Sequence, residues 1–193
     1  MESNRPFRAF KRRTQSGMSL LETMIALTIL LIASVGLLSM GMIAMATTEN
    51  QGHLVARTAE YAQDKMEQLN SLAWGDTVTD TTVFPMCGPL TTPSCTTGTG
   101  LTVGGSSDPT APVTTPGNGY VDYLDSSGNQ LVATGGVVPS DWYYIRVWQI
   151  SNPAGFSANI KQITVTSKVR LQVGAPQGAL PQSALTTLKS SPF

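Results

Sequence analysis

The feature that most constrains this chain is an uninterrupted apolar run near its N-terminus. No charged residue occurs from Thr23 to Thr48, a stretch of 26 positions. An α-helix needs roughly 20 apolar residues to cross the hydrocarbon layer of a bilayer. The run contains no proline, so nothing interrupts the backbone hydrogen bonds that lipid makes obligatory. The sequence therefore predicts a membrane-spanning helix.

Positive charge is concentrated in front of this run. Five basic residues precede it: Arg5, Arg8, Lys11, Arg12 and Arg13. Because basic residues favour the cytoplasmic side of a membrane, we expect a cytoplasmic N-terminus and a C-terminal part outside the cytoplasm. Lys plus Arg and Asp plus Glu each number 12 over the 193 residues. This balance gives no global basic field, so composition offers no support for nucleic acid as a partner.

The position of Gly17 distinguishes the run from an ordinary secretory signal. Such a signal has a short apolar stretch followed by a small-residue cleavage site. Here the small residue lies between the basic leader and the apolar run. Cleavage after Gly17 would leave the whole hydrophobic segment on the mature protein. An uncleaved signal anchor is the alternative interpretation.

Glu22 places one carboxylate near the start of the apolar run. An acidic residue costs about 2.5–3.5 kcal/mol at the centre of a membrane helix, and less near its end. Glu22 therefore needs a cationic partner. Cleavage after Gly17 would create an α-amino group on Met18, and the ammonium of a neighbouring copy would compensate the charge better than the helix dipole alone. The alternative is a side chain that only snorkels to the interface.

Gly17, Met18, Glu22 and the apolar run together resemble the N-terminal processing motif of type IV prepilins and pseudopilins. The resemblance implies cleavage between Gly17 and Met18 by a prepilin peptidase, methylation of the Met18 amine, and pairing of Glu22 with an adjacent pilin subunit. It also implies an assembly ATPase and a platform protein as partners. The family usually carries phenylalanine after the cut. Because methionine is also bulky and apolar, we expect processing to be retained.

Past Ala46 the helical pattern continues but becomes one-sided. Apolar residues recur at spacings of three and four: Val55, Ala59, Ala62, Met66, Leu69 and Ala73. Polar residues fill the intervals: Glu49, Arg57, Glu60, Asp64, Lys65 and Glu67. We predict one helix from Met18 to about Trp74, with residues 18–46 in the membrane and residues 47–74 against a head. The run Ala59–Trp74 is similar to the corresponding helix of PilV-type minor pilins.

Residues 75–119 are rich in Thr, Gly, Pro and Ser and show no regular periodicity. We expect a long exposed loop or two short strands with loops. Cys87 and Cys95 are the two cysteines of the chain. In a segment expected outside the cytoplasm, they predict one local disulfide. A metal site there lacks the further ligands that it would need.

Strand patterns return in Tyr120–Leu124, Trp142–Ile150 and Ile160–Val173. We expect an antiparallel sheet over residues 120–173, in which the last two strands form a hairpin that covers the helix near Met66 and Leu69. Residues after Gly174 look loosely structured.

The first strand of this hairpin has aromatic residues at both odd-numbered and even-numbered positions, so both of its faces carry them. We assign Tyr143, Ile145 and Val147 to the core. The outward set would then be Trp142, Tyr144, Arg146 and Trp148. Of these, Trp142, Tyr144 and Trp148 are candidates for contact with a ligand or a subunit. The alternative is that Trp142 and Trp148 pack beneath the long loop.

No pattern indicates catalysis or a cofactor. His53 has no nucleophile beside it and is expected to face solvent. The glycines of Gly98–Gly105 are not followed by a helix, so they do not form a phosphate-binding loop. Asp122 and Asp125 do not have the spacing of a calcium loop. A β-turn through residues 127–129 explains this segment better.

These observations predict an α+β, pilin-like fold, with residues 1–17 as a removed leader and residues 75–193 as an extracytoplasmic head. The leading hypothesis is a minor pilin of a type IV pilus, held first in the bacterial inner membrane and then in the pilus. A minor pseudopilin of a type II secretion system is the nearest alternative. A membrane-tethered binding protein is the third.

Overall fold

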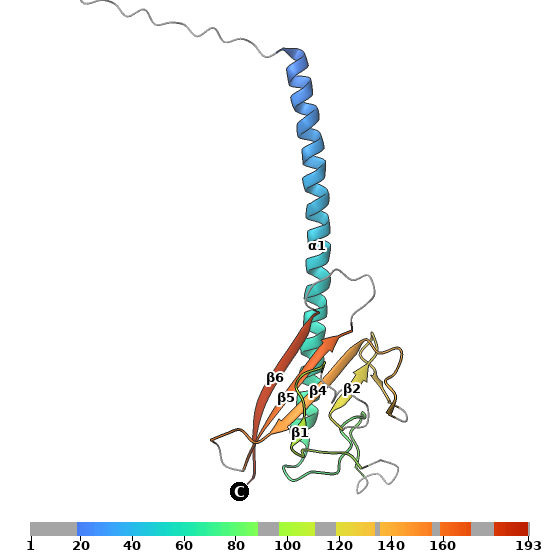
Figure 1. Ribbon diagram of the computed structural model, residues 1–193, viewed down its shortest axis with the longest axis vertical. Coiled ribbons are helices and arrows are strands. Elements are labelled where there is room, and N and C mark those ends of the chain that lie inside the picture. The colour runs from blue at the N-terminus through green and yellow to red at the C-terminus, as the bar shows by residue number, and fades with distance from the viewer. Residues whose placement is uncertain are drawn as a thin grey trace, which may run out of the picture. The chain divides into compact units, whose positions relative to one another are not determined.

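The computed structural model describes residues 19–88, 97–110, 119–133, 136–155, 159–170 and 180–192. The chain divides into two compact units, Met1–Thr47 and Thr48–Phe193. One long helix, α1, contributes to both units, and the strands belong to the second (Figure 1). The elements are α1 (Leu20–Ser71), β1 (Gly104–Gly105), β2 (Val121–Leu124), β3 (Gln130–Leu131), β4 (Tyr144–Ser151), β5 (Ile160–Val169) and β6 (Gln182–Ser190). The predicted α+β, pilin-like arrangement is confirmed.

The N-terminal half of α1 is apolar on all sides. Every side chain from Ser19 to Met40 is exposed, and Leu37 and Leu38 each expose more than 70 % of their surface. By length and composition α1 can cross a membrane. An apolar surface of this extent is typical of a membrane-spanning segment.

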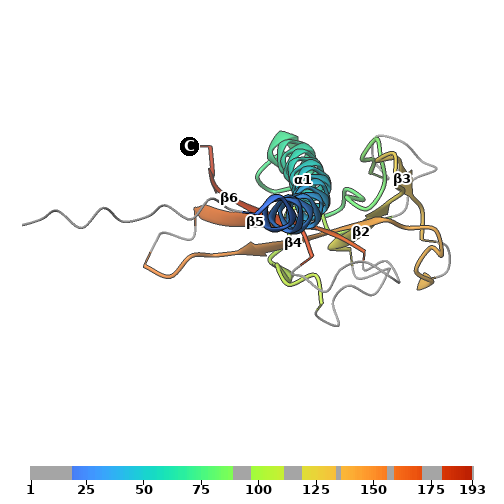
Figure 2. The ribbon, with the colours of Figure 1, turned by 90° about the horizontal axis from the view of Figure 1, so that it is seen from above.

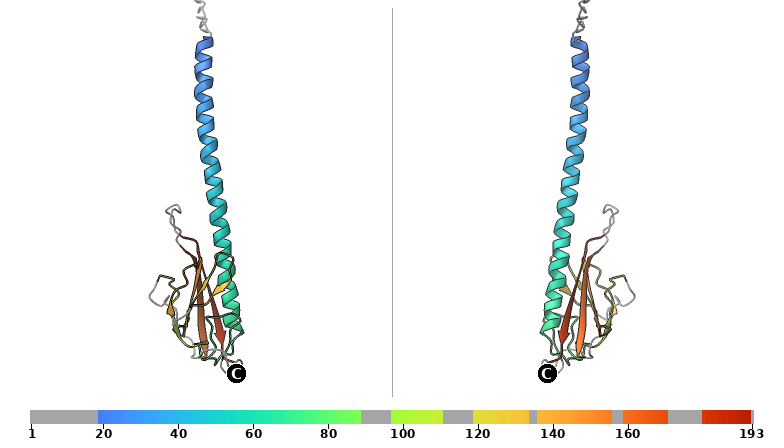
Figure 3. Two further views of the ribbon diagram at one scale, coloured as in Figure 1. Left: turned by 90° about the vertical axis from the view of Figure 1, so that its right-hand side faces the viewer. Right: turned by 90° about the vertical axis from the view of Figure 1, so that its left-hand side faces the viewer.

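The second unit contains a single antiparallel sheet with strand order β3-β2-β4-β5-β6, and β1 pairs with the end of β4. Figure 2 shows β3 and β6 at opposite ends of this sheet. The C-terminal half of α1 lies along one face (Figure 3). In the hairpin, Trp148 lies opposite Val165 and Ile150 opposite Ile163. The expected strands are therefore present as β2, β4 and β5, and the last two form the predicted hairpin; β5 ends at Val169, and residues 171–173 of the expected strand lie outside the described residues.

The core forms where α1 meets β4 and β5. Met66 and Leu69 share one hydrophobic cluster with Ile163 and Val165. These helix residues are three apart, so they lie on one face of α1. The predicted packing of the hairpin against the helix near Met66 and Leu69 is confirmed.

The predicted orientation of β4 is wrong. Tyr144, Arg146 and Trp148 turn toward α1 and expose only 3 %, 2 % and 0 % of their surfaces. Ile145 and Val147 pack on the opposite face with Val121 and Tyr123. Both faces of β4 are covered, so alternation between apolar and polar residues carried no information about which face meets the helix.

The residues after Leu180 form a regular strand, contrary to the expectation of a loose tail. The whole of β6 pairs with β5, from Lys168 opposite Gln182 to Ile160 opposite Ser190. Leu185 packs against the core cluster. The Ser183 hydroxyl lies 2.9 Å from that of Thr58 on α1.

In the described parts of the segment after α1, residues 75–88 and 97–110, a short strand with loops is present, which agrees better with the second expectation than with a long exposed loop. Leu101 is completely buried in the core cluster, and Gly104 and Gly105 pair with β4 as β1. Gly105 has a φ of 79°, and a Cβ there would lie 2.2 Å from the Trp148 carbonyl oxygen. The glycines of this stretch thus allow the backbone to approach β4 closely.

The turn predicted after Asp125 is confirmed. The Asp125 amide donates to the Asn129 carbonyl at 2.9 Å, and the Asp125 carboxylate accepts the amides of Ser127 and Asn129. This turn joins β2 to β3.

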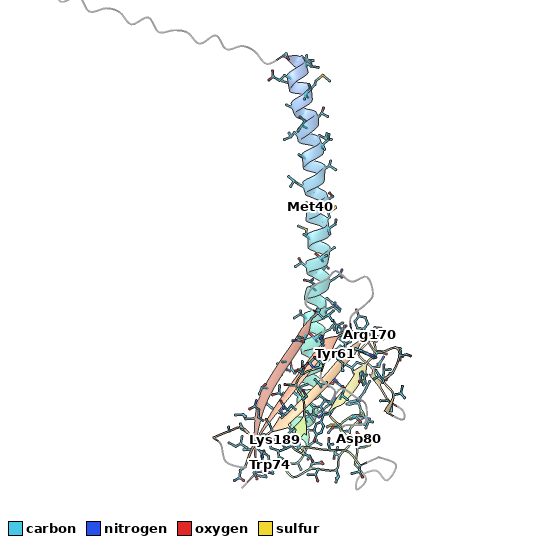
Figure 4. All side chains as sticks on the ribbon, in the orientation of Figure 1. Met40, Tyr61, Trp74, Asp80, Arg170 and Lys189 are labelled. Atoms are coloured by element: carbon cyan, nitrogen blue, oxygen red, sulfur yellow. The ribbon has the colours of Figure 1, made fainter. Side chains whose placement is uncertain are left out.

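Two lysines from the sheet satisfy carbonyls at the C-terminal end of α1. Lys189 donates to the carbonyls of Asn70 and Leu72, each at 2.6 Å. Lys161 donates to the Trp74 carbonyl at 2.9 Å. Lys189 and Trp74 lie at the same end of the head in Figure 4. The last carbonyls of a helix lack partners within it and carry partial negative charge, so these ammonium groups hold the end of α1 against the sheet.

Candidate assembly site

Glu22 lies in the first turn of α1. Ser19 begins the helix, because its carbonyl accepts the Glu22 amide at 3.0 Å and its hydroxyl lies 3.3 Å from the same nitrogen. A serine in this position gives an amide of the first helical turn a side-chain acceptor in addition to the carbonyl. The carboxylate therefore lies at the positive end of the helix dipole, where negative charge is favoured.

Five hydroxyl side chains of the apolar segment after Glu22 are satisfied by the helix itself. Thr23, Thr28, Ser34, Ser39 and Thr47 each donate to a carbonyl three or four residues earlier, at 2.7–3.0 Å. Such bonds remove the cost of placing a hydroxyl in lipid.

Glu22 differs from these residues because its carboxylate has no hydrogen-bond or ion-pair partner among the described residues. No described lysine or arginine lies in the sequence before Arg57. A cation for Glu22 must therefore come from outside the described part of this chain. Gly17 and Met18, the predicted cleavage and methylation sites, lie outside the described residues.

The head contains a buried cluster of charged side chains that links α1 to the sheet. Arg146 on β4 binds both carboxylate oxygens of Asp122 on β2, at 2.8 Å each. Lys65 on α1 lies 2.8 Å from the same carboxylate. Asp64, which is half exposed, completes the cluster with a 2.8 Å contact to Arg146. We call these four residues the charge cluster.

The charges in this cluster depend on one another. Burial raises the pKa of Asp122, but the charges of Arg146 and Lys65 and their hydrogen bonds outweigh it and hold the pKa below its usual value. Burial lowers the pKa of Lys65, and the Asp122 carboxylate offsets part of this effect. Lys65 also donates to the Thr81 carbonyl and lies 4.4 Å from the centre of the Trp148 ring. Asp122 is thus the anion on which two buried cations rely.

The sequence interpretation missed this cluster. It counted Lys65 among the polar residues that lie between the apolar positions of the helix, and it placed Arg146 on the outward face of its strand. A usable signal was present, because Asp122 and Arg146 are single charges within otherwise apolar strands. A buried charge needs a partner of opposite charge, so each of these two residues predicts an opposite charge on another segment of the chain.

The predicted row of exposed aromatics does not exist. Trp148 and Tyr144 are buried beneath α1, and Tyr144 packs edge-on against Tyr61 at 4.9 Å. Trp142 lies before β4 and is half-buried, with its ring 5.6 Å from that of Tyr123. The guanidinium of Arg170 covers the Trp142 ring at 5.0 Å. These residues form no common surface for a ligand or a subunit.

Of the two cysteines in the predicted disulfide, the structure describes Cys87 alone. The Cys87 carbonyl accepts the Asp80 amide at 2.7 Å, which closes the segment between them. Cys95 lies outside the described residues. The Cys87–Cys95 disulfide therefore stays a prediction.

The described residues contain no group of three or more His, Cys, Asp and Glu side chains that could together hold a metal ion. His53 is exposed, as expected. A shallow hollow on the sheet face opposite α1 is lined by polar side chains such as Thr164, Thr166 and Lys168.

Comparison with protein families identifies the N-terminal segment. Residues 12–38 match the prokaryotic N-terminal methylation motif. This match includes Gly17, Met18 and Glu22 and the first part of the apolar run. Comparisons with curated proteins and with solved structures give no significant match.

Proposed function

The chain carries the type IV pilin-like prepilin signature, and on this premise we propose that it is a minor pilin subunit of a type IV pilus. Prepilin peptidase removes residues 1–17 by cleavage between Gly17 and Met18, and the new Met18 amine is methylated. The basic leader keeps the N-terminus in the cytoplasm, so the head lies outside the cytoplasm, first at the inner membrane and then in the pilus.

The observation that carries this proposal is the isolated carboxylate of Glu22. Neighbouring hydroxyls in the apolar segment are satisfied within α1, whereas Glu22 has no cation among the described residues. A second processed subunit supplies an ammonium group four residues before its own Glu22, at a similar depth in the membrane. Pairing the two charges lowers the cost of keeping each in lipid and fixes the axial register of adjacent helices.

Several further features belong to the same proposal. The chemistry of assembly requires other pilin subunits, and the resemblance implies an assembly ATPase and a platform protein. The PilV-type assignment rests on the run Ala59–Trp74, which supplies Asp64 and Lys65 to the charge cluster. A Cys87–Cys95 disulfide would form in the oxidising compartment and restrain the loop that precedes β1.

A minor pseudopilin of a type II secretion system is the second candidate, because the same methylation motif supports it equally. Identifying the filament that contains the chain distinguishes the two functions. The third candidate, a tethered binding protein, rested on an exposed aromatic row, and burial of Tyr144 and Trp148 removes that support.

The test is a Glu22→Ala variant of the full chain, with Glu49→Ala as control. Glu49 is an exposed acid on the same helix beyond the uncharged run. We expect both variants to lose the leader normally, as seen by mass spectrometry of the mature N-terminus. Glu22→Ala should be strongly depleted from sheared filaments, whereas Glu49→Ala should enter them. Normal incorporation of Glu22→Ala would contradict the charge-pairing mechanism.

A further inference from the structure

The outer edge of β6 has the features of a strand edge that can pair with another strand. β6 is nine residues long and lies at the end of the sheet, with no described strand beyond it (Figure 1). Natural sheets protect such edges with short strands, prolines, bulges or charges. The one charge in β6, Lys189, is bound to the carbonyl of Asn70 on α1 and to that of Leu72, which follows the helix. Pro181 and Pro192 flank the strand but do not enter it.

The hydrogen-bond pattern shows which backbone groups face outward. At one end of the β5·β6 pair the Val169 amide donates to the Pro181 carbonyl, and at the other the Ser191 amide donates to the Asn159 carbonyl. Bonded and non-bonded pairs alternate in an antiparallel ladder. The odd-numbered residues of β6 therefore bond to β5. The even-numbered residues direct their N–H and C=O groups to the free edge, and these are Gln182, Ala184, Thr186, Leu188 and Ser190.

The direction of β6 limits what can pair with it. Ser183, near its start, contacts Thr58, and Lys189, near its end, contacts Asn70 and Leu72. β6 thus runs in the same direction as α1. An antiparallel partner must run against the direction of this helix.

A second copy of the chain does not meet this requirement. If two copies paired antiparallel through β6, their helices would also be antiparallel, and the Thr48 ends that continue into the apolar segments would lie on opposite sides. Two chains anchored in one membrane cannot adopt that arrangement. The other free edges that the described sheet offers, β1 and β3, are only two residues long.

We propose that the edge of β6 binds an extended β-strand of a different protein chain, which adds to the sheet in antiparallel orientation. The outward set has no charged side chain, and Leu188 is 55 % exposed. An uncharged strand with β-branched residues would match it. In excluding a second copy, this inference rests on the membrane anchoring of the proposed function, but it does not depend on Glu22.

The test places a photo-crosslinking amino acid at position 188 of the full chain in its native cells. The same label at position 132 is the control, because Val132 is exposed and follows β3 at the opposite edge of the sheet. A Thr186→Pro change removes one outward N–H and leaves the ladder to β5 intact. Thr186→Val keeps that N–H and is the matched control.

We expect an adduct from position 188 with one other protein, whose crosslinked peptide lies in a β-strand. Thr186→Pro should reduce its yield about tenfold, because one backbone hydrogen bond is lost and its partner is left unsatisfied, while Thr186→Val should not. An adduct with a second copy, an adduct that survives Thr186→Pro, or a yield no higher than at position 132 would overturn the proposal. Repeating the crosslinking measurement in Glu22→Ala tests this proposal separately from the proposed assembly mechanism. Loss of the ion pair between Glu22 and the Met18 ammonium and loss of strand pairing at β6 are independent outcomes.

Should Thr186→Pro impair folding, amide hydrogen exchange in the unmodified chain decides the question. In native membranes the amides of Ala184, Thr186 and Leu188 should exchange about tenfold or more slowly than in the detergent-purified chain, because pairing protects them. The amides of Leu185 and Thr187, which bond to β5, should be protected in both. Equal exchange of the outward amides in the two samples would overturn the proposal.

Discussion

Replacing Asp122 by asparagine tests whether the charge cluster holds α1 on the sheet. The change keeps the size of the side chain and removes its charge. Arg146 retains Asp64, whose side chain is 55 % exposed, but Lys65 is fully buried and loses its anion. Removing one partner of a buried ion pair costs about 3–5 kcal/mol. For a unit of this size, that loss lowers the unfolding temperature by roughly 10 °C or more.

The assay is thermal and denaturant unfolding of the full chain in detergent, followed by tryptophan fluorescence. Trp148 is a suitable reporter because it is buried and lies 4.4 Å from the Lys65 ammonium. Asp141→Asn removes the same charge from an exposed site and is the control. The penalty of Asp122→Asn should shrink as the pH rises, because Lys65, whose pKa burial lowers, can then lose its proton.

A double-mutant cycle separates the charge effect from general disruption. Lys65→Met in the Asp122→Asn background removes the stranded cation, so the combined loss should be smaller than the sum of the single losses by more than about 1 kcal/mol. Additive losses, or an Asp122→Asn variant as stable as Asp141→Asn, would refute the idea that Asp122 compensates Lys65 and Arg146.

Three further predictions concern pH, the end of the helix and the leader. The pKa of Asp122 is held below its usual value. The stabilising contribution of its carboxylate is therefore complete above about pH 5, and it is lost as the pH falls through the unfolded-state pKa near 3.9 and then through the lower folded-state pKa. The difference in unfolding free energy between the wild type and Asp122→Asn should narrow in acid, and a constant difference would contradict this. Lys189→Met keeps the aliphatic stem but loses the contacts to the carbonyls of Asn70 and Leu72, and should cost about 1–2 kcal/mol and speed amide exchange in the last turn of α1. Unchanged exchange would argue against stabilisation of the helix end by Lys189. Gly17→Leu should block leader removal, and a variant that still migrates as the mature form on a gel would contradict cleavage after Gly17.

The long elements of this fold follow from local patterns in the sequence. The uncharged run predicts the first half of α1. The spacing of Met66 and Leu69 predicts the second half, because the buried residues there repeat with the period of a helix. Alternation in Ile160–Val169 predicts β5 and the face that it turns to α1, because one of its faces is markedly more apolar than the other. The methylation motif is likewise local, which is why Gly17, Met18 and Glu22 are identifiable from one short segment.

The errors arise where distant segments decide the outcome. In β4, Ile145 and Val147 are as apolar as Tyr144 and Trp148, so pattern alone cannot choose the face. The choice depends on Arg146, which is stable in the interior only because Asp122 lies on the neighbouring strand. β6 was missed because it has two threonines but no valine, isoleucine or aromatic residue, and pairing with β5 supplies the order.

The parallel course of β6 and the C-terminal half of α1 has a mechanical consequence. Traction on the helix toward its N-terminal end would load the contacts from Thr58 to Leu72 in shear, so that they resist together and do not open one after another. A sheet attached to a helix in this way can take up tension along the whole contact without first separating at one end.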